Sequence, residues 1–186
     1  AFSEAQENGF LTTEYQLVQI YLLHCLNEKE QAVELFGKLK SKKEVAKNKQ
    51  LSGICEYLEY VLDENKEVFE TSAKEMQFLE KQYKEGCRSP FLYLQACRLA
   101  EKDGALLRRF GGFTRQVMLF AKRHGILSEE MAFRATDLSE NLREYSESVY
   151  ELLEYIYQRY PSTQVVRAIC LLIMKGNPGE ERYFKW

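Results

Sequence analysis

Three prolines divide this sequence, and each stands where a helix is expected to begin or end. They are Pro90, Pro161 and Pro178. Proline lacks a backbone N–H and its ring clashes with the preceding turn, so it is disfavoured inside helices. The long spans between the prolines carry apolar residues at three- and four-residue steps, the repeat of one helix face. The spacing therefore predicts an all-α chain and argues against a turn-rich β fold.

The stretch from Lys84 to Cys97 predicts a sharp joint between two helices. Gly86 can adopt the left-handed conformation that closes a helix. Ser89 can accept hydrogen bonds from the unpaired N–H groups of the next helix, and Pro90 suits a first turn, where no N–H is needed. We expect one helix to end and another to begin within these few residues.

The apolar steps along the whole chain predict about nine helices. Thr13 and Gln16 form a capping box that should begin the first, and Val18, Leu22 and Cys25 form its expected buried face. The expected helices are Tyr15–Leu26, Gln31–Leu39, Leu51–Leu62, Val68–Tyr83, one after Pro90, one from Leu106 to His124 that Gly111 and Gly112 break or bend, one capped by Ser128, Ser146–Tyr160, and Gln164–Met174.

A 36-residue period links the first half of the chain to the joint. The sequence has three Tyr-Leu pairs, which begin at Tyr21, Tyr57 and Tyr93 and are 36 residues apart. This period is close to that of helical-hairpin repeats. We expect the three tyrosines to occupy equivalent, mostly buried positions, in a right-handed α-α superhelix that spans residues 1–186 as a single domain. A start without methionine and an end at Trp186 suggest a piece of a longer chain.

The run from Lys38 to Lys49 is the densest group of positive charges. It suggests binding of a polyanion or a nucleic acid. However, no aromatic residue is interleaved for base stacking, and no arginine is present for bidentate phosphate contacts. We interpret the run as a solvated connector between helices and keep polyanion binding as an alternative.

Cys87 is the sharpest candidate for chemistry. It precedes a helix N-terminus and adjoins Arg88, and both features lower the pKa of a thiol. A nucleophile also needs a base, and His124 is the candidate for that role. A thiol-dependent enzyme or a redox sensor is therefore an alternative function, weighed against an ordinary turn cysteine.

The remaining residues suggest no cofactor or metal. His24 and His124 are far apart in sequence, and Gly111-Gly112 lacks the lysine and hydroxyl residue of a phosphate-binding loop. All five cysteines are expected to be reduced, because their number is odd and no C-x-x-C spacing occurs. A net charge of −2 and the absence of a leader-like segment favour a cytoplasmic protein without general affinity for nucleic acid or membranes.

The span Gln164–Met174 is apolar on nearly every side. It is too short to cross a bilayer, which takes about 20 residues. Val165, Val166, Ile169, Leu172 and Ile173 are expected to need more cover than one preceding helix gives. Tyr183, Phe184 and Trp186 could supply it as an aromatic lid, or a second copy of the chain could pair with this helix.

Several short segments of the C-terminal half together have the pattern of a known family. They are Gly86–Pro90, Leu92–Leu94, Leu106–Arg108, Gln116–Val117, His124–Gly125, Leu127–Glu130, Ala168–Cys170, Lys175–Asn177 and Tyr183–Phe184. With these segments, about residues 84–186 resemble a family of very large uncharacterised bacterial proteins, which have β-rich modules toward the N-terminus and tetratricopeptide-like helical repeats toward the C-terminus. The resemblance implies a helical-repeat fold and a scaffold without catalysis, cofactor or known site residues.

These observations together favour a module that holds a protein partner or connects other domains of its parent chain. The composition and the motifs of the sequence identify neither the partner nor the face that binds it.

Overall fold

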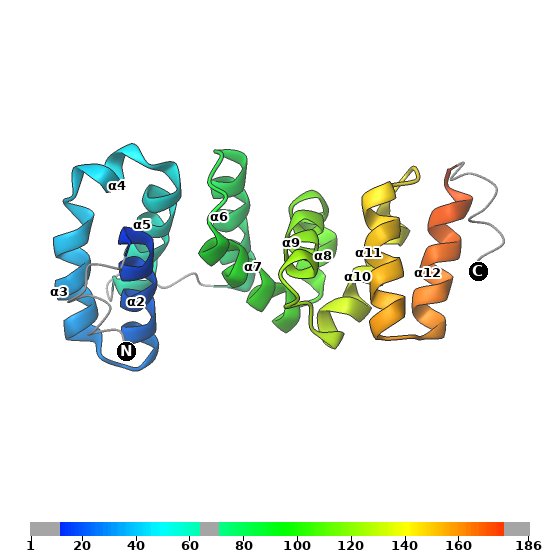
Figure 1. Ribbon diagram of the computed structural model, residues 1–186, viewed down its shortest axis with the longest axis horizontal. Coiled ribbons are helices and arrows are strands. Elements are labelled where there is room, and N and C mark those ends of the chain that lie inside the picture. Colours follow the sequence, from blue (N-terminus) through cyan, green and yellow to red (C-terminus); the bar gives the residue numbers. More distant parts are fainter. Residues whose placement is uncertain (1–11, 64–70, 177–186) are drawn as a thin grey trace. The chain divides into compact units, whose positions relative to one another are not determined.

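The computed structural model describes residues 12–63 and 71–176, and all regular structure in those ranges is helical (Figure 1). Nine of the described helices have twelve or more residues, while α4 and α8 have five each. The all-α class is confirmed over the described residues, where the nine longer helices match the number expected. The bounds are α2 (Thr13–Cys25), α3 (Lys29–Lys40), α4 (Lys43–Lys47), α5 (Lys49–Leu62), α6 (Ser72–Lys84), α7 (Pro90–Lys102), α8 (Ala105–Arg109), α9 (Gly111–Arg123), α10 (Glu129–Asn141), α11 (Glu147–Arg159) and α12 (Thr163–Met174).

The chain divides into two compact units. Unit 1 comprises Ala1–Lys74 and Lys81–Leu92, and unit 2 comprises Glu75–Glu80 and Tyr93–Trp186. Each unit has fully buried apolar side chains of its own: Leu17, Ile20, Ile54 and Leu58 in unit 1, and Leu99, Met118, Leu152 and Ile169 in unit 2.

Unit 1 is built on three long helices that contact one another. α2 packs against α3 and α5, α3 also packs against α5, and the short α4 joins α3 to α5. Three aromatic rings meet within this unit: the Tyr21 centroid lies 6.3 Å from that of Tyr57 and 5.2 Å from that of Phe91. Tyr57 and Phe91 meet edge to face at 5.7 Å, a favourable arrangement for aromatic pairs.

The first helix forms, but two details predicted for it are wrong. Its N-cap is Thr12, which makes no side-chain cap hydrogen bond, while the Thr13 hydroxyl donates to Glu44 Oε2 at 3.2 Å. The buried face carries Leu17 and Ile20, whereas Leu22 is 43% exposed. Cys25 is exposed as well. Apolar residues occur on two faces of α2, so periodicity along this segment does not decide which face is buried.

The joint between α6 and α7 is confirmed in detail. Gly86 has φ 96°, and its N–H donates to the Tyr83 carbonyl while the N–H of Cys87 donates to the Gln82 carbonyl. These two bonds form the Schellman arrangement that closes helices. Ser89 Oγ accepts from the N–H of Phe91 at 3.2 Å, and the Ser89 hydroxyl donates to Glu14 Oε1 at 3.1 Å. Proline at position 90 is the first residue of α7.

Other predicted boundaries also hold. Ser128 caps α10 by accepting from the N–H of Met131, and α11 ends at Arg159, just before Pro161. The predicted interruption near Gly111 separates α8 from α9 at Phe110. A Cβ added at either Gly111 or Gly112 would meet no atom within 4 Å, so these glycines mark a bend rather than a close helix contact. Val68, expected in the fourth helix, lies outside the described residues.

The 36-residue period does not give equivalent environments. Tyr57 is 1% exposed, while Tyr21 and Tyr93 are half-buried. The leucine after each tyrosine differs more: Leu58 is fully buried, but Leu22 is 43% exposed and Leu94 is 45% exposed. The prediction of three equivalently buried positions is therefore wrong, because the leucine that follows each tyrosine is packed in α5 and exposed in α2 and α7.

Unit 2 packs in a regular order. Each helix from α8 to α11 contacts the next one, and α8, α9 and α10 also contact α10, α11 and α12 respectively. α12 therefore has two covering helices, and α11 lies beside it in Figure 1. Val165, Ile169, Leu172 and Ile173 are buried, and Val166 is half-buried. The proposed aromatic lid lies outside the described residues.

Candidate functional site

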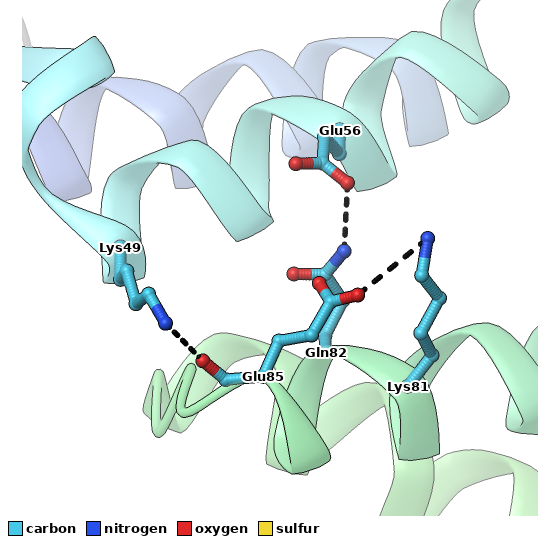
Figure 2. A network of polar contacts seen from close by, with 5 residues as sticks. All are labelled: Lys49, Glu56, Lys81, Gln82 and Glu85. Carbon is cyan, nitrogen blue, oxygen red and sulfur yellow. Dashed lines mark hydrogen bonds and ion pairs between the residues drawn. The ribbon is translucent and has the colours of Figure 1, made fainter.

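A polar hollow of about 210 Å³ lies in unit 1, where α5 faces the joint that follows α6. Its residues come from both elements: Lys49, Ser52, Gly53 and Glu56 from α5, and Gln82, Glu85 and Cys87 from the end of α6 and the turn after it. Figure 2 shows the charged and amide groups of this hollow reaching between the two elements. Polar groups from distant sequence positions converge here.

Three polar contacts cross or flank the hollow (Figure 2). Lys49 Nζ donates to the main-chain carbonyl of Glu85, and Gln82 Nε2 donates to Glu56 Oε2 at 2.7 Å. Lys81 Nζ lies 3.7 Å from the Glu85 carboxylate. Because the last carbonyls of a helix have no partner within it, the Lys49 ammonium compensates both the unpaired carbonyl and the negative end of the α6 dipole.

Gln50 fastens the turn after α6 to the start of α5. Its Oε1 accepts from the N–H of Arg88, and the thiol of Cys87 lies 3.5 Å from the same oxygen. The Arg88 guanidinium lies 3.7 Å from the centre of the Tyr83 ring and donates to the Tyr83 carbonyl. The turn is thus held by hydrogen bonds, by a cation–π contact and by its own backbone closure.

Gly53 allows the two elements to approach closely. A Cβ at this position would lie 2.7 Å from Cys87 Sγ and 2.8 Å from Gln82 Oε1, both too short for a normal contact. Gln82 and Cys87 are only 3% and 5% exposed, because α5 covers them. Glycine therefore serves close packing here and not an unusual backbone conformation, because a larger residue would displace the Cys87 and Gln82 side chains.

The structure reverses the direction predicted for the Cys87 thiol. Burial raises its pKa, while the Ser89 backbone and the Arg88 charge act in the opposite, lowering direction with smaller effect. The sequence correctly identified the groups that favour the thiolate but could not show that α5 covers the sulfur. Desolvation penalises a charged thiolate, so the environment favours the neutral thiol.

His124, the base proposed for Cys87, does not form a nucleophile–base pair with it within either unit. Cys87 belongs to unit 1 and His124 to unit 2. The His124 ring packs against Phe120, with centroids 4.3 Å apart. Among the described residues, no group of three or more His, Cys, Asp or Glu side chains could hold a metal ion.

The lysine run is exposed, as predicted for a solvated connector, but it is largely helical. Several of its ammonium groups already face carbonyl or carboxylate oxygens of the chain. Lys38 pairs with Glu34 at 2.5 Å, Lys40 pairs with Glu59, and Lys42 Nζ is 3.4 Å from Gln16 Oε1. Val45 of α4 is buried and anchors the connector. These intramolecular pairs reduce the positive charge that the run presents.

Sequence reasoning did not single out Gln50 or Gly53, and it considered Lys49 only as the end of the lysine run. Two of these three residues have partners roughly one period away: Lys49 bonds Glu85 across 36 positions and Gln50 bonds Arg88 across 38. These two separations are close to the 36-residue spacing of the Tyr-Leu pairs. The 36-residue spacing in the sequence could therefore have indicated that the start of α5 and the turn after α6 lie opposite each other.

Comparison with known proteins gives one family and nothing beyond it. Residues 13–186 match the family described as Family of unknown function (DUF5717) N-terminal. The match reaches far upstream of the segment 84–186 on which the resemblance was based, and it describes an N-terminal region rather than a C-terminal one. No curated protein and no solved structure matches the chain. Because the match covers nearly its whole length, the chain belongs to the DUF5717 N-terminal family of unknown function.

Proposed function

We propose that this chain is a helical-repeat module that holds a protein partner or connects other domains of a longer parent chain, without catalysing a reaction. The observation that carries the proposal is the packing order in unit 2, where helices contact both the next helix and the next but one. Stacked helical hairpins produce that order, and such stacks present extended surfaces to other proteins. A right-handed superhelix is the arrangement we propose for them.

Exposed apolar side chains on α2 and at its C-cap, Leu26, support an interaction role. Tyr15 is 58% exposed, Leu22 43% and Leu26 70%, and half-buried Val18 lies on the same side of the helix. Their spacing follows the seam of a helix that packs against another helix. Single exposed leucines are common on protein surfaces, but several along one helix face favour an interaction surface.

The polar hollow supports a structural role for its residues. Its lysine, glutamine and cysteine side chains bond to neighbouring parts of unit 1 and hold α5 against the following joint. The raised pKa of Cys87 weighs against the thiol-enzyme alternative. The internal ion pairs of the lysine run weigh against polyanion binding there.

We favour a protein as the partner that this module binds, and we propose that the chain is located in the cytoplasm. No described helix is long and apolar enough to span a membrane. A homodimer through α12 is a further arrangement under this proposal, because Met174 is 79% exposed at the end of that helix.

Affinity capture tests the interaction proposal. Immobilised wild-type chain and a Leu22→Asp, Leu26→Asp variant would be exposed to extract from the source cells, and each retained protein would then be purified and titrated against both. We expect a partner that binds the wild type in a saturable way and binds the variant at least about tenfold more weakly.

A Lys29→Gln, Glu30→Gln variant serves as the matched control, because it alters the neighbouring exposed residues at the start of α3 without changing net charge. Circular dichroism would verify that each variant is folded. Retention of chaperones alone, with no saturable binding by any purified candidate, would contradict the proposal. Light scattering of the wild type distinguishes a homodimer from a monomer.

A further inference from the structure

Three side chains that line the polar hollow of unit 1 have hydrogen-bonding atoms without a partner in the described part of the chain. They are Ser52, Glu56 and Gln82. Ser52 and Glu56 are four residues apart on α5, so they lie on one face of that helix. Gln82 comes from α6, and its Nε2 donates to Glu56 Oε2 at 2.7 Å. Unused acceptors from two helices therefore meet in one hollow.

The Gln82 amide is the most informative of these groups, because the residue is only 3% exposed. Its Oε1 accepts no hydrogen bond from any residue that the structure describes, although most buried polar side-chain atoms in proteins have a partner. In Figure 2, this oxygen and the second oxygen of Glu56 point to the same side of the bond that joins the two residues. An unpartnered acceptor on a buried side chain that lines a hollow indicates that a donor belongs there.

Glu56 adds a negative charge to these acceptors. Within the described ranges, its carboxylate bonds only to the Gln82 amide and has no ion-pair partner. Glu85, the other carboxylate residue of the hollow, is instead paired with Lys81 at 3.7 Å. The ammonium group of Lys49 donates to the main-chain carbonyl of Glu85. The Glu56 carboxylate therefore lies beside neutral acceptors without a cation bound to it.

The lining selects an organic cation with N–H donors. An anion would meet the Glu56 carboxylate and oxygen acceptors, which repel it. Over residues 12–63 and 71–176, no cluster of three or more His, Cys, Asp or Glu side chains could hold a metal ion. The volume of about 210 Å³ is below the roughly 300–1,000 Å³ of pockets for drug-sized ligands, so one functional group fits rather than a whole cofactor.

A guanidinium group matches these requirements. It carries a positive charge, and its planar fork of N–H groups donates to several oxygens at once. We propose that the hollow binds a guanidinium group, which donates to the Glu56 carboxylate, to Gln82 Oε1 and to Ser52 Oγ. The group belongs either to a free small molecule or to an arginine side chain of a partner protein. The inference goes beyond the proposed function, because a free guanidino compound would bind whether or not the chain also holds a protein partner.

Propylguanidinium is the probe, and its neutral analogue propylurea measures what the charge contributes. Each would be titrated into the full chain at constant ionic strength and followed by amide chemical shifts in two-dimensional NMR spectra. We expect saturable binding of propylguanidinium with a Kd of about 1 mM and shift changes centred on residues 49–56 and 82–87. Propylurea, and tetramethylammonium as a cation without N–H donors, should each bind at least about fivefold more weakly.

Glu56→Gln should weaken the binding of propylguanidinium about fivefold to tenfold, because a neutral amide replaces a charged acceptor. Glu59→Gln is the matched control: it removes the same charge from the same helix, but Glu59 does not line the hollow and pairs with Lys40. The control should bind the probe as the wild type does. Ser52→Ala, which removes a hydroxyl that bonds to no described residue, should weaken binding about twofold to threefold and keeps the test decisive if Glu56→Gln does not fold.

Several results would overturn the proposal. They are equal affinity of the wild type and Glu56→Gln, equal affinity for propylguanidinium and propylurea, shift changes centred outside the hollow, and no saturable binding up to about 20 mM probe, roughly twentyfold above the expected Kd. Equal weakening by Glu56→Gln and Glu59→Gln would overturn it as well, because the effect would then follow from net charge alone.

A blocked tripeptide with a central arginine distinguishes the two sources of the group. Tighter binding of the tripeptide than of propylguanidinium assigns the hollow to a partner's arginine, and weaker binding assigns it to a free molecule; either result supports the proposal when Glu56→Gln reduces it. The capture experiment separates this inference from the proposed function. A wild type that binds propylguanidinium but no cellular partner would leave this inference standing alone, and one that binds a partner but not the probe would leave only the proposed function.

Discussion

Close packing at single residues holds the turn between α6 and α7 against α5 in unit 1. Gly53 leaves room for Cys87 and Gln82, and Gln50 bonds the turn that follows α6. None of these residues belongs to a recognisable sequence motif. Each affects the packing of the joint through the side chains that lie opposite it. Two predictions at this scale follow from the contacts of Gly53 and Cys87.

Gly53→Ala should destabilise the protein. The added Cβ would lie 2.7 Å from Cys87 Sγ, so the Cys87 and Gln82 side chains would have to shift within a buried contact. We expect a loss of about 1–3 kcal/mol in the free energy of unfolding, measured by urea denaturation. Gly37→Ala in α3 is the control, because its Cβ would meet nothing within 4 Å and alanine favours helix by about 1 kcal/mol. Equal effects of the two substitutions would contradict the close contact.

Cys87 should react slowly with iodoacetamide in the folded protein. Burial raises its pKa, and only the thiolate is strongly nucleophilic. Peptide mass spectrometry after timed alkylation near neutral pH should show the exposed Cys25 modified well before Cys87. Both should react readily in denaturant. Rapid selective labelling of Cys87 in the folded state would instead favour the thiol-enzyme alternative.

At the scale of elements, the chain closes its helices with short local devices. Asn27, Gly86 and Gly125 have positive φ angles after α2, α6 and α9, and each segment shows the same pair of backbone hydrogen bonds. Ser128 and Ser162 cap α10 and α12 through their hydroxyl oxygens. Such devices end and begin helices independently of the fold around them.

Ser89→Ala should cost more than an ordinary loop substitution. The change removes the hydrogen bond to the N–H of Phe91 and the bond to Glu14, at a residue that is 1% exposed. We expect a loss of about 1–2 kcal/mol in the free energy of unfolding. Ser146→Ala is the control, since Ser146 precedes α11 without a side-chain cap bond. Thermal and urea denaturation should both rank the two variants in this order, and a reversed order would reject the capping role.

At the scale of the whole molecule, buried thiols couple stability to pH. Burial raises the pKa of Cys55 to about 11 and that of Cys97 to about 12. An unfolded thiol has a pKa of about 8.5, so above that value the unfolded chain binds fewer protons than the folded one. The stabilisation is complete below the unfolded pKa and is lost as pH rises toward the folded value.

Unfolding free energy should therefore fall between about pH 9 and pH 11, by at most about 1.4 kcal/mol per pH unit for each such thiol. Cys97→Ala should shift stability by a constant amount near neutral pH and reduce the slope above about pH 9. Urea titrations at several pH values would measure both. A slope unchanged by the substitution would show that Cys97 does not remain protonated in the folded chain.

Local chemistry in the sequence determined the helical class, the joint at residues 84–97 and most helix ends, because caps, prolines and positive-φ glycines act within a few residues. Tertiary structure alone decided which face of α2 is buried, since apolar residues occupy two of its faces. It also decided the direction of the Cys87 pKa shift, because desolvation depends on α5, more than 30 positions away in the chain. Burial is set by what packs opposite a residue, and that partner is chosen by the fold.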